Sequence, residues 1–279
     1  MTHQNKYTVT KLHGLGNNFI IIDNRQKCVA AASALAKEIC SINYGIGADG
    51  LILLENSSEA DFRMRIFNSD GSEPEMCGNG IRCFAWYIAG KKISTQNSLR
   101  IMTGAGIIKT DLISHSGNSA EVQVDMGMPS LSGKDFTAKP GISTALIDGR
   151  EYFFVSMGNP HAVTFVEDFN FDYTKTGQSV ENNSVYFPHK TNVEFIRVVS
   201  DNELDMRVWE RGCGETTACG TGACASVVAA KKKGHVASRI VTVHLPGGDL
   251  RIEWEETFSV LMTGPAQTVL EGTYFYGTH

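Results

Sequence analysis

The sequence predicts an α+β fold of two pseudo-symmetric domains, each a curved β-sheet wrapped around a central α-helix. Three observations lead to this prediction. The chain repeats itself once, short β-branched runs dominate both halves, and an apolar helical segment follows the motif Cys-Gly-X-Gly in each half. A length of 279 residues with 42% hydrophobic residues also suits two domains of ordinary size.

The repeat is found by aligning Cys77 with Cys219, which sets a numbering offset of 142 (219 − 77). Without a gap, MRIFNSDGSEPEMCGNG at 64–80 then lies on MRVWERGCGETTACGTG at 206–222, with identical residues at six positions. A single duplication of this length indicates two similar domains instead of a solenoid. The interface between the two domains is then the candidate site.

The same offset pairs Asn17 with Asn159, so the register holds across about sixty residues, which chance alignment rarely produces. We expect the first domain to span 1–120, joined by a last strand at 267–279. The second domain is expected to span 121–266.

The predicted strands are short β-branched or alternating runs separated by many of the 28 glycines. In chain order they are 19–23, 51–55, 62–67 and 120–126, then 161–167, 192–199, 203–209, 239–245 and 249–255. An outer helix is predicted at 31–41.

A central helix is predicted directly after each Cys-Gly-X-Gly motif. The first has the i, i+3, i+4, i+7 pattern of a helix with one apolar face, in Ile81, Phe84, Ala85 and Ile88. The second, ACASVVAA at 223–230, is apolar all round, which indicates a helix enclosed by other structure. Gly90 and Gly234 are expected at the two C-terminal ends.

Charge and cysteine content exclude several function classes. A net charge of −5 and a pI near 5.9 give no support to nucleic-acid binding. No stretch is long and apolar enough to span a bilayer, and the N-terminus lacks the apolar region of a signal peptide, so we expect a cytoplasmic protein without membrane contact. The seven cysteines are expected to be thiols, and their spacing lacks the paired Cys-x2-Cys pattern of zinc sites, so no metal is expected.

Cysteine and glycine at a helix N-terminus suit acid–base chemistry beside a carboxylate. Free backbone N–H groups and the partial positive charge of the helix end can bind an anion, and the same field favours a thiolate. Cys77 and Cys219 could therefore lie on opposite faces of one α-carbon, where one thiolate removes the proton and the opposite thiol returns one. No lysine lies in a context that suggests a Schiff base, so no cofactor is implied. Structural roles are expected for the remaining cysteines, Cys28, Cys40, Cys83, Cys213 and Cys224.

With these motifs the chain resembles the diaminopimelate epimerase family over nearly its whole length. The matching motifs are KLHGLGNNF at 11–19, GIGADG at 45–50, FNSDGSEPEMCGNGIRC at 67–83, SMGNPHAV at 156–163, NVEF at 192–195, ERGCGETTACGTGACA at 210–225, LPGGDLRIEW at 245–254 and MTGPA at 262–266. The resemblance implies two domains with mostly antiparallel β-sheets or barrels around a central helix, commonly as a homodimer. It also implies cofactor-independent interconversion of LL- and meso-diaminopimelate in lysine and peptidoglycan precursor biosynthesis.

The resemblance also implies roles for individual residues. Cys77 and Cys219 match the two acid–base cysteines, and His161 and Glu210 match residues that tune them. The matching substrate-binding positions are Asn17, Asn68, Gly78, Asn79, Asn159, Asn192, Glu210, Arg211, Gly220 and Thr221. Within this set, Gly78-Asn79 and Gly220-Thr221 match the backbone cradle for the reacting carboxylate. Some family members carry Gln where this chain has Gly50, so no role is assigned to Gly50.

Two alternatives stay open at this stage. A proline racemase-like enzyme would use a similar cysteine pair without needing Asn68, Asn159, Asn192 and Arg211. A non-catalytic amino-acid binding protein would leave both cysteines without a chemical role. A dehydrogenase is disfavoured, because HGLGNNF has Phe19 at the position of the third glycine of a dinucleotide motif. Which of the two cysteines is the thiolate at rest is also open, because the pair titrates together.

Overall fold

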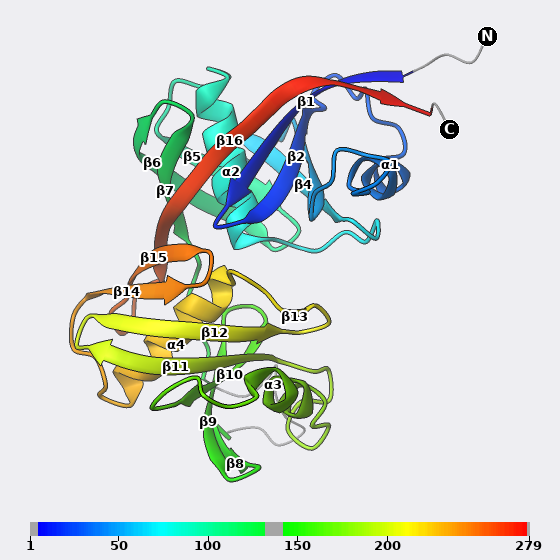
Figure 1. The fold of residues 1–279 in the computed structure, drawn as a ribbon. Helices are drawn as coiled ribbons and strands as arrows, with labels where there is room; N and C mark the ends of the chain where they lie inside the picture. Colours follow the sequence, from blue (N-terminus) through cyan, green and yellow to red (C-terminus); the bar gives the residue numbers. More distant parts are fainter. Residues whose placement is uncertain (1–4, 132–141, 278–279) are drawn as a thin grey trace. The chain divides into compact units, whose positions relative to one another are not determined.

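The computed structural model describes residues 5–131 and 142–277, and the chain divides into two compact units. Unit 1 comprises 1–124 with 264–279, and unit 2 comprises 125–263. Residues 1–4 of the expected first domain and 132–141 of the expected second domain lie outside the described residues. Figure 1 shows both units, with β16 drawn in red.

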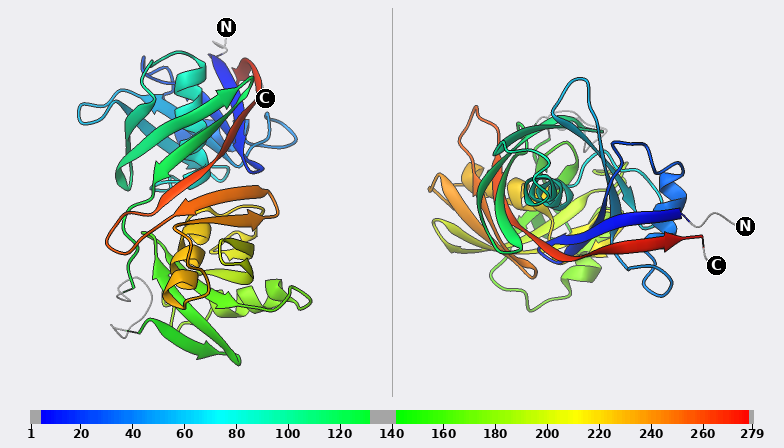
Figure 2. Two further views of the ribbon diagram at one scale, coloured as in Figure 1. Left: turned by 90° about the vertical axis from the view of Figure 1, so that its left-hand side faces the viewer. Right: turned by 90° about the horizontal axis from the view of Figure 1, so that it is seen from above.

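Unit 1 is a closed barrel of eight strands with the helix α2 inside it. The strand order is β1-β2-β3-β4-β5-β6-β7-β16, and a further pairing between β1 and β16 closes the ring. The strands are β1 (Asn5–Gly14), β2 (Asn17–Asp23), β3 (Gly50–Glu55), β4 (Phe62–Asn68), β5 (Ser98–Thr103), β6 (Gly106–Ser116), β7 (Ser119–Asp125) and β16 (Leu261–Tyr276). The view from above in Figure 2 shows α2 end-on within this ring.

Unit 2 has a similar strand order around the helix α4, and no pairing between its end strands β8 and β16 is found among the described residues. Its strand order is β16-β15-β14-β12-β11-β10-β9-β8, and the short β13 pairs with β12. Only the first three residues of β16, Leu261–Thr263, belong to this unit, where they pair with β15. The other strands are β8 (Thr144–Ile147), β9 (Arg150–Ser156), β10 (Pro160–Phe165), β11 (Asn192–Ser200), β12 (Glu203–Glu210), β13 (Gly214–Glu215), β14 (Ile240–Leu245) and β15 (Gly248–Glu253).

Within residues 5–131 and 142–277, each unit has two helices, and each of these helices connects two parallel strands. Most strand pairs are antiparallel, and the parallel ones are β2–β3, β4–β5, β10–β11 and β12–β14. A parallel pair needs a crossover connection, and the helices provide it. They are α1 (Ala32–Ile39), α2 (Gly78–Gly90), α3 (Tyr173–Glu181) and α4 (Gly220–Lys232).

The repeat in the sequence is present in the structure with the same offset. It separates the first residues of α2 and α4 (220 − 78 = 142), their last residues (232 − 90 = 142), and the first residues of β5 and β14 (240 − 98 = 142). The predicted fold class is therefore confirmed. Gly90 is the last residue of α2, as expected, and the left-handed residue that follows is Lys92, with φ of 54°, at the position equivalent to Gly234 with φ of 74°.

The apolar runs have a simple physical cause in unit 1. Residues 19–22 of β2 and 50–54 of β3 are buried without alternation, because α2 covers the inner face of these strands and α1 covers the outer face. Leu35 and Ile39 of α1 pack on the outer face in a cluster with Ile20 and Leu51. Among residues 5–131 and 142–277, no helix has both the length and the apolar character needed to cross a membrane.

The buried thiol of Cys83 makes the protein sensitive to alkaline pH. Burial raises its pKa from 9.0 to about 12. The folded chain keeps the proton where an unfolded chain releases it, so this thiol contributes stability that is complete below about pH 9 and is lost as the pH rises towards 12. Between about pH 8 and about pH 10 we expect the free energy of unfolding to fall by about 1 kcal/mol from this group alone.

Urea unfolding with a reductant at both pH values measures this loss. The Cys83→Ala variant should lose about 1 kcal/mol less than the parent over the same interval. An equal loss in both proteins would contradict the prediction.

Candidate functional site

Cys77 and Cys219 occupy equivalent positions, because each is the N-cap residue of the central helix of its unit. Both have extended backbone conformations, and neither thiol caps its own helix. The first intrahelical hydrogen bonds run from Ile81 N–H to Cys77 O (2.9 Å) and from Ala223 N–H to Cys219 O (3.0 Å). The N–H groups directly after each cysteine therefore point out of the helix end, where an anion can bind.

The residues around Cys77 form a hydrogen-bonded group in unit 1, here named the first half-site. It comprises Asn17, Asp49, Cys77, Asn79 and Arg82. Cys77 Sγ lies 3.8 Å from Asn17 Oδ1, which also accepts a hydrogen bond from Asn79 Nδ2 (3.2 Å). Asn17 Nδ2 donates to Asp49 Oδ2 (2.8 Å), and Arg82 Nη2 donates to Asn79 Oδ1 (2.9 Å). Asn17 begins β2 and Asp49 directly precedes β3, so two neighbouring strands hold this group at one end of the barrel.

The residues around Cys219 form the second half-site in unit 2. It comprises Asn159, His161, Glu194, Glu210, Cys219 and Thr221. Cys219 Sγ lies 3.6 Å from Thr221 Oγ1, which accepts from Asn159 Nδ2 (3.3 Å). Asn159 Oδ1 lies 3.0 Å from His161 Nε2, and His161 Nδ1 lies 2.6 Å from Glu194 Oε1. A continuous hydrogen-bonded chain thus runs from a buried carboxyl group to the thiol.

The surroundings of Cys219 favour the protonated thiol. Burial raises the pKa of Cys219 well above its ordinary value of 9.0, and the charges of Glu210 and Glu194 raise it further. A hydrogen bond joins the thiol to Glu210, whose Oε1 also accepts from Thr216 Oγ1 (2.5 Å). At Cys219, burial and two carboxyl groups therefore oppose the thiolate that the helix end favours.

His161 and Glu194 form a fully buried pair on the adjacent parallel strands β10 and β11. Burial raises the pKa of Glu194, while the neighbouring His161 lowers it. The second carboxyl oxygen of Glu194, Oε2, is buried and has no hydrogen-bond partner among the described residues. The imidazole orientation is fixed by this pair, because one ring nitrogen contacts Glu194 and the other contacts Asn159.

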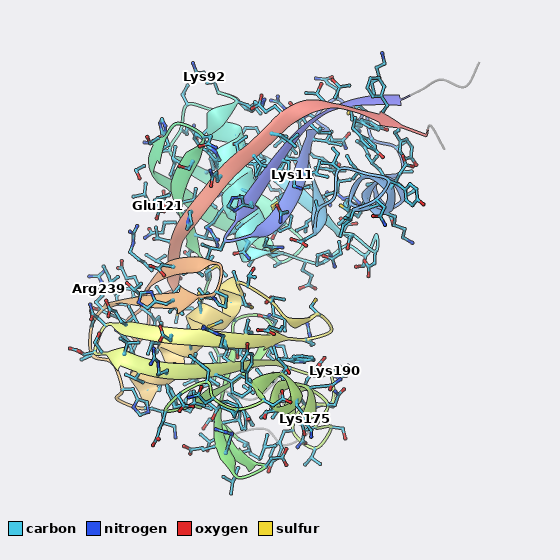
Figure 3. The ribbon with its side chains drawn as sticks, viewed as in Figure 1. Lys11, Lys92, Glu121, Lys175, Lys190 and Arg239 are labelled. Atoms are coloured by element: carbon cyan, nitrogen blue, oxygen red, sulfur yellow. The ribbon has the colours of Figure 1, made fainter. Side chains whose placement is uncertain are left out.

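Asn192, the first residue of β11, contacts Arg211, which directly follows β12. Asn192 Oδ1 accepts from Arg211 N–H (3.0 Å), and Asn192 Nδ2 donates to Pro160 O (2.9 Å). The next residue of the turn, Gly212, donates its N–H to Glu181 Oε1 (2.9 Å). Lys190, labelled in Figure 3, pairs with the same oxygen at 3.3 Å. These contacts fix the backbone of the turn and leave the Arg211 side chain exposed.

Asn68 ends β4 in unit 1, opposite Gly50 in the strand register. Its Nδ2 donates to Ser72 Oγ (2.9 Å). A Cβ atom at Gly50 would lie only 2.8 Å from Phe67 O, so the backbone itself requires glycine there.

The structure thus groups the predicted residues into sets within each unit. Asn17, Gly78 and Asn79 lie around Cys77, whereas Asn159, His161, Glu210, Gly220 and Thr221 lie around Cys219; Asn192 and Arg211 contact each other, and Asn68 contacts Ser72. The roles assigned to these residues stay predictions.

Sequence reasoning missed Asp49, Arg82 and Glu194. For two of them a signal was available: Arg82 interrupts an apolar helix, and Glu194 interrupts an apolar strand, and charged residues are almost never fully buried without a partner. Asp49 gave no comparable signal, because an acidic residue before a strand is ordinary in a surface loop.

The chain is similar to known proteins over nearly its whole length. The sequence model of a family described as diaminopimelate epimerase matches residues 9–132 and 153–269. The diaminopimelate epimerase of Desulfitobacterium hafniense is 51% identical over 275 residues, which cover 95% of this chain and 96% of that protein. The diaminopimelate epimerase of Halothermothrix orenii is 49% identical over 280 residues, with 94% and 96% covered. That of Methanococcus maripaludis is 45% identical over 272 residues, with 94% and 98% covered.

Solved structures of other enzymes share the fold at low identity. A phenazine biosynthesis protein of the PhzF family from Bacillus anthracis superposes with a TM-score of 0.71 at 16% identity, covering 96% of this chain and 99% of that one. A hydroxyproline epimerase from Agrobacterium vitis superposes with a TM-score of 0.70 at 14% identity, covering 99% and 93%. These similarities support the two-unit α+β fold class and carry no information about substrate.

Proposed function

The chain belongs to the diaminopimelate epimerase family, and from this premise we propose that it interconverts LL- and meso-diaminopimelate by a two-base mechanism in which Cys77 and Cys219 are the acid and the base. The enzyme class is that of an amino-acid epimerase, as in the relatives that cover nearly the whole chain. The observation that carries the proposed mechanism is the equivalent placement of the two cysteines, each at the start of a buried central helix.

The reacting carboxylate is bound by the two helix ends in this proposal. The backbone N–H groups of Gly78-Asn79 and of Gly220-Thr221 directly follow the cysteines and precede the first intrahelical hydrogen bonds. Their donors, together with the partial positive charge of each helix end, stabilise the negative charge that spreads onto the carboxylate when the α-proton leaves.

Proton transfer then needs one thiolate and one thiol. The thiolate takes the α-proton and becomes a thiol, and the opposite thiol gives its proton to the other face of the carbon and becomes a thiolate, so the configuration inverts and charge is conserved. Glu210 accepts a hydrogen bond from the Cys219 thiol and can hold its proton. His161 acts through Asn159 and Thr221, which connect its imidazole to Cys219 Sγ.

The distal end of the substrate is recognised by a second polar set in this proposal. Arg211 presents a planar guanidinium that suits a carboxylate, and its side chain is exposed while its backbone is fixed by Asn192. Asn68, Asn159 and Glu210 offer amide and carboxyl groups to the distal ammonium and carboxylate. An analogue without these groups leaves polar side chains unpaired, which costs binding free energy and gives specificity.

Hydrogen exchange in heavy water tests the function and separates it from the alternatives. We expect the protein to exchange the α-hydrogen of LL-diaminopimelate and of meso-diaminopimelate, and to leave proline unexchanged, as followed by NMR or mass spectrometry. Exchange of proline instead would indicate a proline racemase-like enzyme. Binding of diaminopimelate without exchange would indicate a non-catalytic binding protein.

We also propose that the protein is a homodimer in the cytoplasm and supplies lysine and peptidoglycan precursors, as the family resemblance implies. Light scattering coupled to size-exclusion chromatography measures the oligomeric state. A mass corresponding to the monomer at working concentration would contradict the dimer.

A further inference from the structure

The first half-site is a hydrogen-bonded chain with a charged group at each end. Arg82 donates to Asn79 Oδ1, Asn79 Nδ2 donates to Asn17 Oδ1, and Asn17 Nδ2 donates to Asp49 Oδ2. A guanidinium carries only donors, and a carboxylate carries only acceptors. Arg82 and Asp49 therefore fix which way the side-chain amides of Asn79 and Asn17 are turned, that is, on which side each has its oxygen and its NH2 group.

The direction of the chain decides which atom faces Cys77. Arg82 requires the oxygen of Asn79 and leaves its NH2 group for Asn17, so Asn17 must present its oxygen. At the opposite end, Asp49 can only accept, so Asn17 must turn its NH2 group towards Asp49. This also leaves the oxygen of Asn17 on the side of Asn79. Both ends agree that the amide oxygen of Asn17 lies next to Cys77 Sγ, at 3.8 Å. A thiol can donate to this oxygen, whereas a thiolate needs a donor.

We propose that Asp49 and Arg82 are positioning residues that hold the amide oxygen of Asn17 against Cys77 Sγ, so that the substrate-free protein keeps Cys77 as a thiol. The catalytic meaning of this arrangement rests on the proposed function, because it concerns the protonation state of a proposed acid–base residue. The arrangement itself concerns only unit 1.

Both ends of the chain are well supported. Arg82 is fully buried, and it also donates from Nη1 to Gly78 O (3.1 Å) and from Nε to Pro265 O (3.3 Å). Asp49 Oδ2 accepts a second hydrogen bond from Asn18 N–H (2.7 Å).

The loop that carries Asp49 is fixed by Lys11 of β1, labelled in Figure 3, whose Nζ donates to Gly47 O (2.7 Å). Asp49 and Arg82 are joined to Cys77 through the two amides, and Lys11 lies beyond Asp49. Cys83 interacts with Cys77 electrostatically, and burial keeps Cys83 protonated with a pKa of about 12.

The equivalent chain in unit 2 differs, because an imidazole lies between its amide, Asn159, and the carboxyl group of Glu194. Asn159 corresponds to Asn17 (159 − 17 = 142) and Thr221 corresponds to Asn79 (221 − 79 = 142). Asn159 contacts Thr221 Oγ1 and His161 Nε2. A hydroxyl group and an imidazole nitrogen can each donate or accept, so this amide can reverse without losing either contact. The two cysteines therefore have different partners: a fixed acceptor beside Cys77 and a reversible chain beside Cys219.

The test is the pH dependence of Cys77 alkylation by iodoacetamide, read at this residue by peptide mass spectrometry without any substrate. The released variant combines Asp49→Asn with Asn79→Ala, which frees Asn17 from both ends and leaves the buried Arg82 in place. We expect the alkylation midpoint of Cys77 to fall by about half a unit to one unit, because the freed amide can turn its N–H towards the thiolate.

Introducing Asp49→Asn and Asn79→Ala into the Asn17→Ala variant separates two causes of a shift: the orientation of the Asn17 amide and the loss of the Asp49 charge. Without the amide of Asn17, the two substitutions should shift the midpoint by less than half as much. An equal shift in both backgrounds would mean that losing the charge of Asp49 is sufficient, and this result would overturn the proposal. No shift, or an upward shift, in the released variant would also overturn it.

Two further proteins complete the design. Asp49→Asn alone, a change at an exposed side chain, should shift the midpoint in the same direction by a smaller amount, which keeps the test valid if the released variant does not fold. Asp61→Asn is the matched control for charge, because Asp61 is an exposed carboxylate of unit 1 that accepts only from Arg100 N–H (2.7 Å) among the side-chain hydrogen bonds described for it. It should leave the midpoint unchanged. Because no turnover is measured, failure here is distinguishable from failure of the proposed epimerase activity.

Discussion

Replacing either Cys77 or Cys219 with alanine is expected to lower kcat for diaminopimelate epimerisation by about a thousandfold. Alanine has no proton to exchange, so one face of the α-carbon loses its acid or base while the carboxylate cradle of backbone N–H groups stays in place. The loss should therefore appear in kcat more than in KM. Chiral chromatography of the product from LL- and from meso-diaminopimelate measures it in both directions.

Two other cysteines on the same helices serve as matched controls. Cys83 in α2 and Cys224 in α4 are fully buried core residues. Truncation of either to alanine should lower stability modestly through a small cavity and leave kcat within about threefold of the parent. Near-normal turnover in Cys77→Ala or in Cys219→Ala would refute the two-base mechanism, whatever the controls show.

Gly222→Ala is expected to lower kcat/KM by about ten- to a hundredfold and the free energy of unfolding by about 1–3 kcal/mol. A Cβ atom at this position would lie 2.7 Å from Glu194 Oε1, which is too close for any real contact. Glu194 cannot move aside cheaply, because it is fully buried and bonded to His161. The shift would pass along the hydrogen-bonded chain that ends at Cys219.

Gly80→Ala is the matched substitution in the other unit (222 − 80 = 142). The atoms nearest to a Cβ atom there are the terminal methyl groups of Ile52 at 3.2 Å and Ile66 at 3.3 Å, followed by Cys77 Cβ at 3.4 Å. Both methyl groups are the ends of flexible side chains. Alanine is also favoured over glycine inside a helix by about 1 kcal/mol. We expect a much smaller loss of activity and stability than for Gly222→Ala. Steady-state kinetics and urea unfolding of both variants decide the comparison, and equal losses would contradict it.

The two units therefore have similar backbone folds, but the side chains near their central helices differ in polarity. His161 and Glu194 of unit 2 correspond to Phe19 (161 − 142) and Ile52 (194 − 142) of unit 1. A buried polar pair in one unit is replaced by apolar side chains in the other, at the same distance along the chain from the helix start. This difference explains why equivalent glycine substitutions are expected to have unequal effects.

Much of the fold could be predicted from the sequence because the repeat and the apolar runs report local and periodic features. The central helices α2 and α4 follow their motifs directly, and the strands β2, β3, β11 and β12 are continuous or alternating apolar runs. The helix α3 was missed because its segment YTKTGQSVE is polar and contains Gly177. Glycine is required there, since a Cβ atom would lie 2.5 Å from Trp209 Cβ. That contact joins residues far apart in the sequence, so no local pattern predicts it.

The strand β1 was missed for a related reason, and β16 was expected only as a last strand at 267–279, without its first residues. The two strands pair Thr8 with Thr273 and Lys11 with Leu270. These partners are separated in the sequence by more residues than one unit contains. Much of β16 is exposed and mixed in polarity, so its pairing is decided by closure of the barrel and not by its own periodicity. At the site, family motifs predicted the residues that could meet substrate, but not Asp49 or Arg82, whose contribution lies in the direction of the hydrogen bonds they impose.

Because the eighth strand of the first barrel is encoded after the entire second unit, the ribosome finishes residues 125–263 before it makes 264–276. The continuous second unit can therefore reach its native state during translation while the earlier part of the chain still has an open sheet edge. This order reverses the usual progression of cotranslational folding from the N-terminal domain.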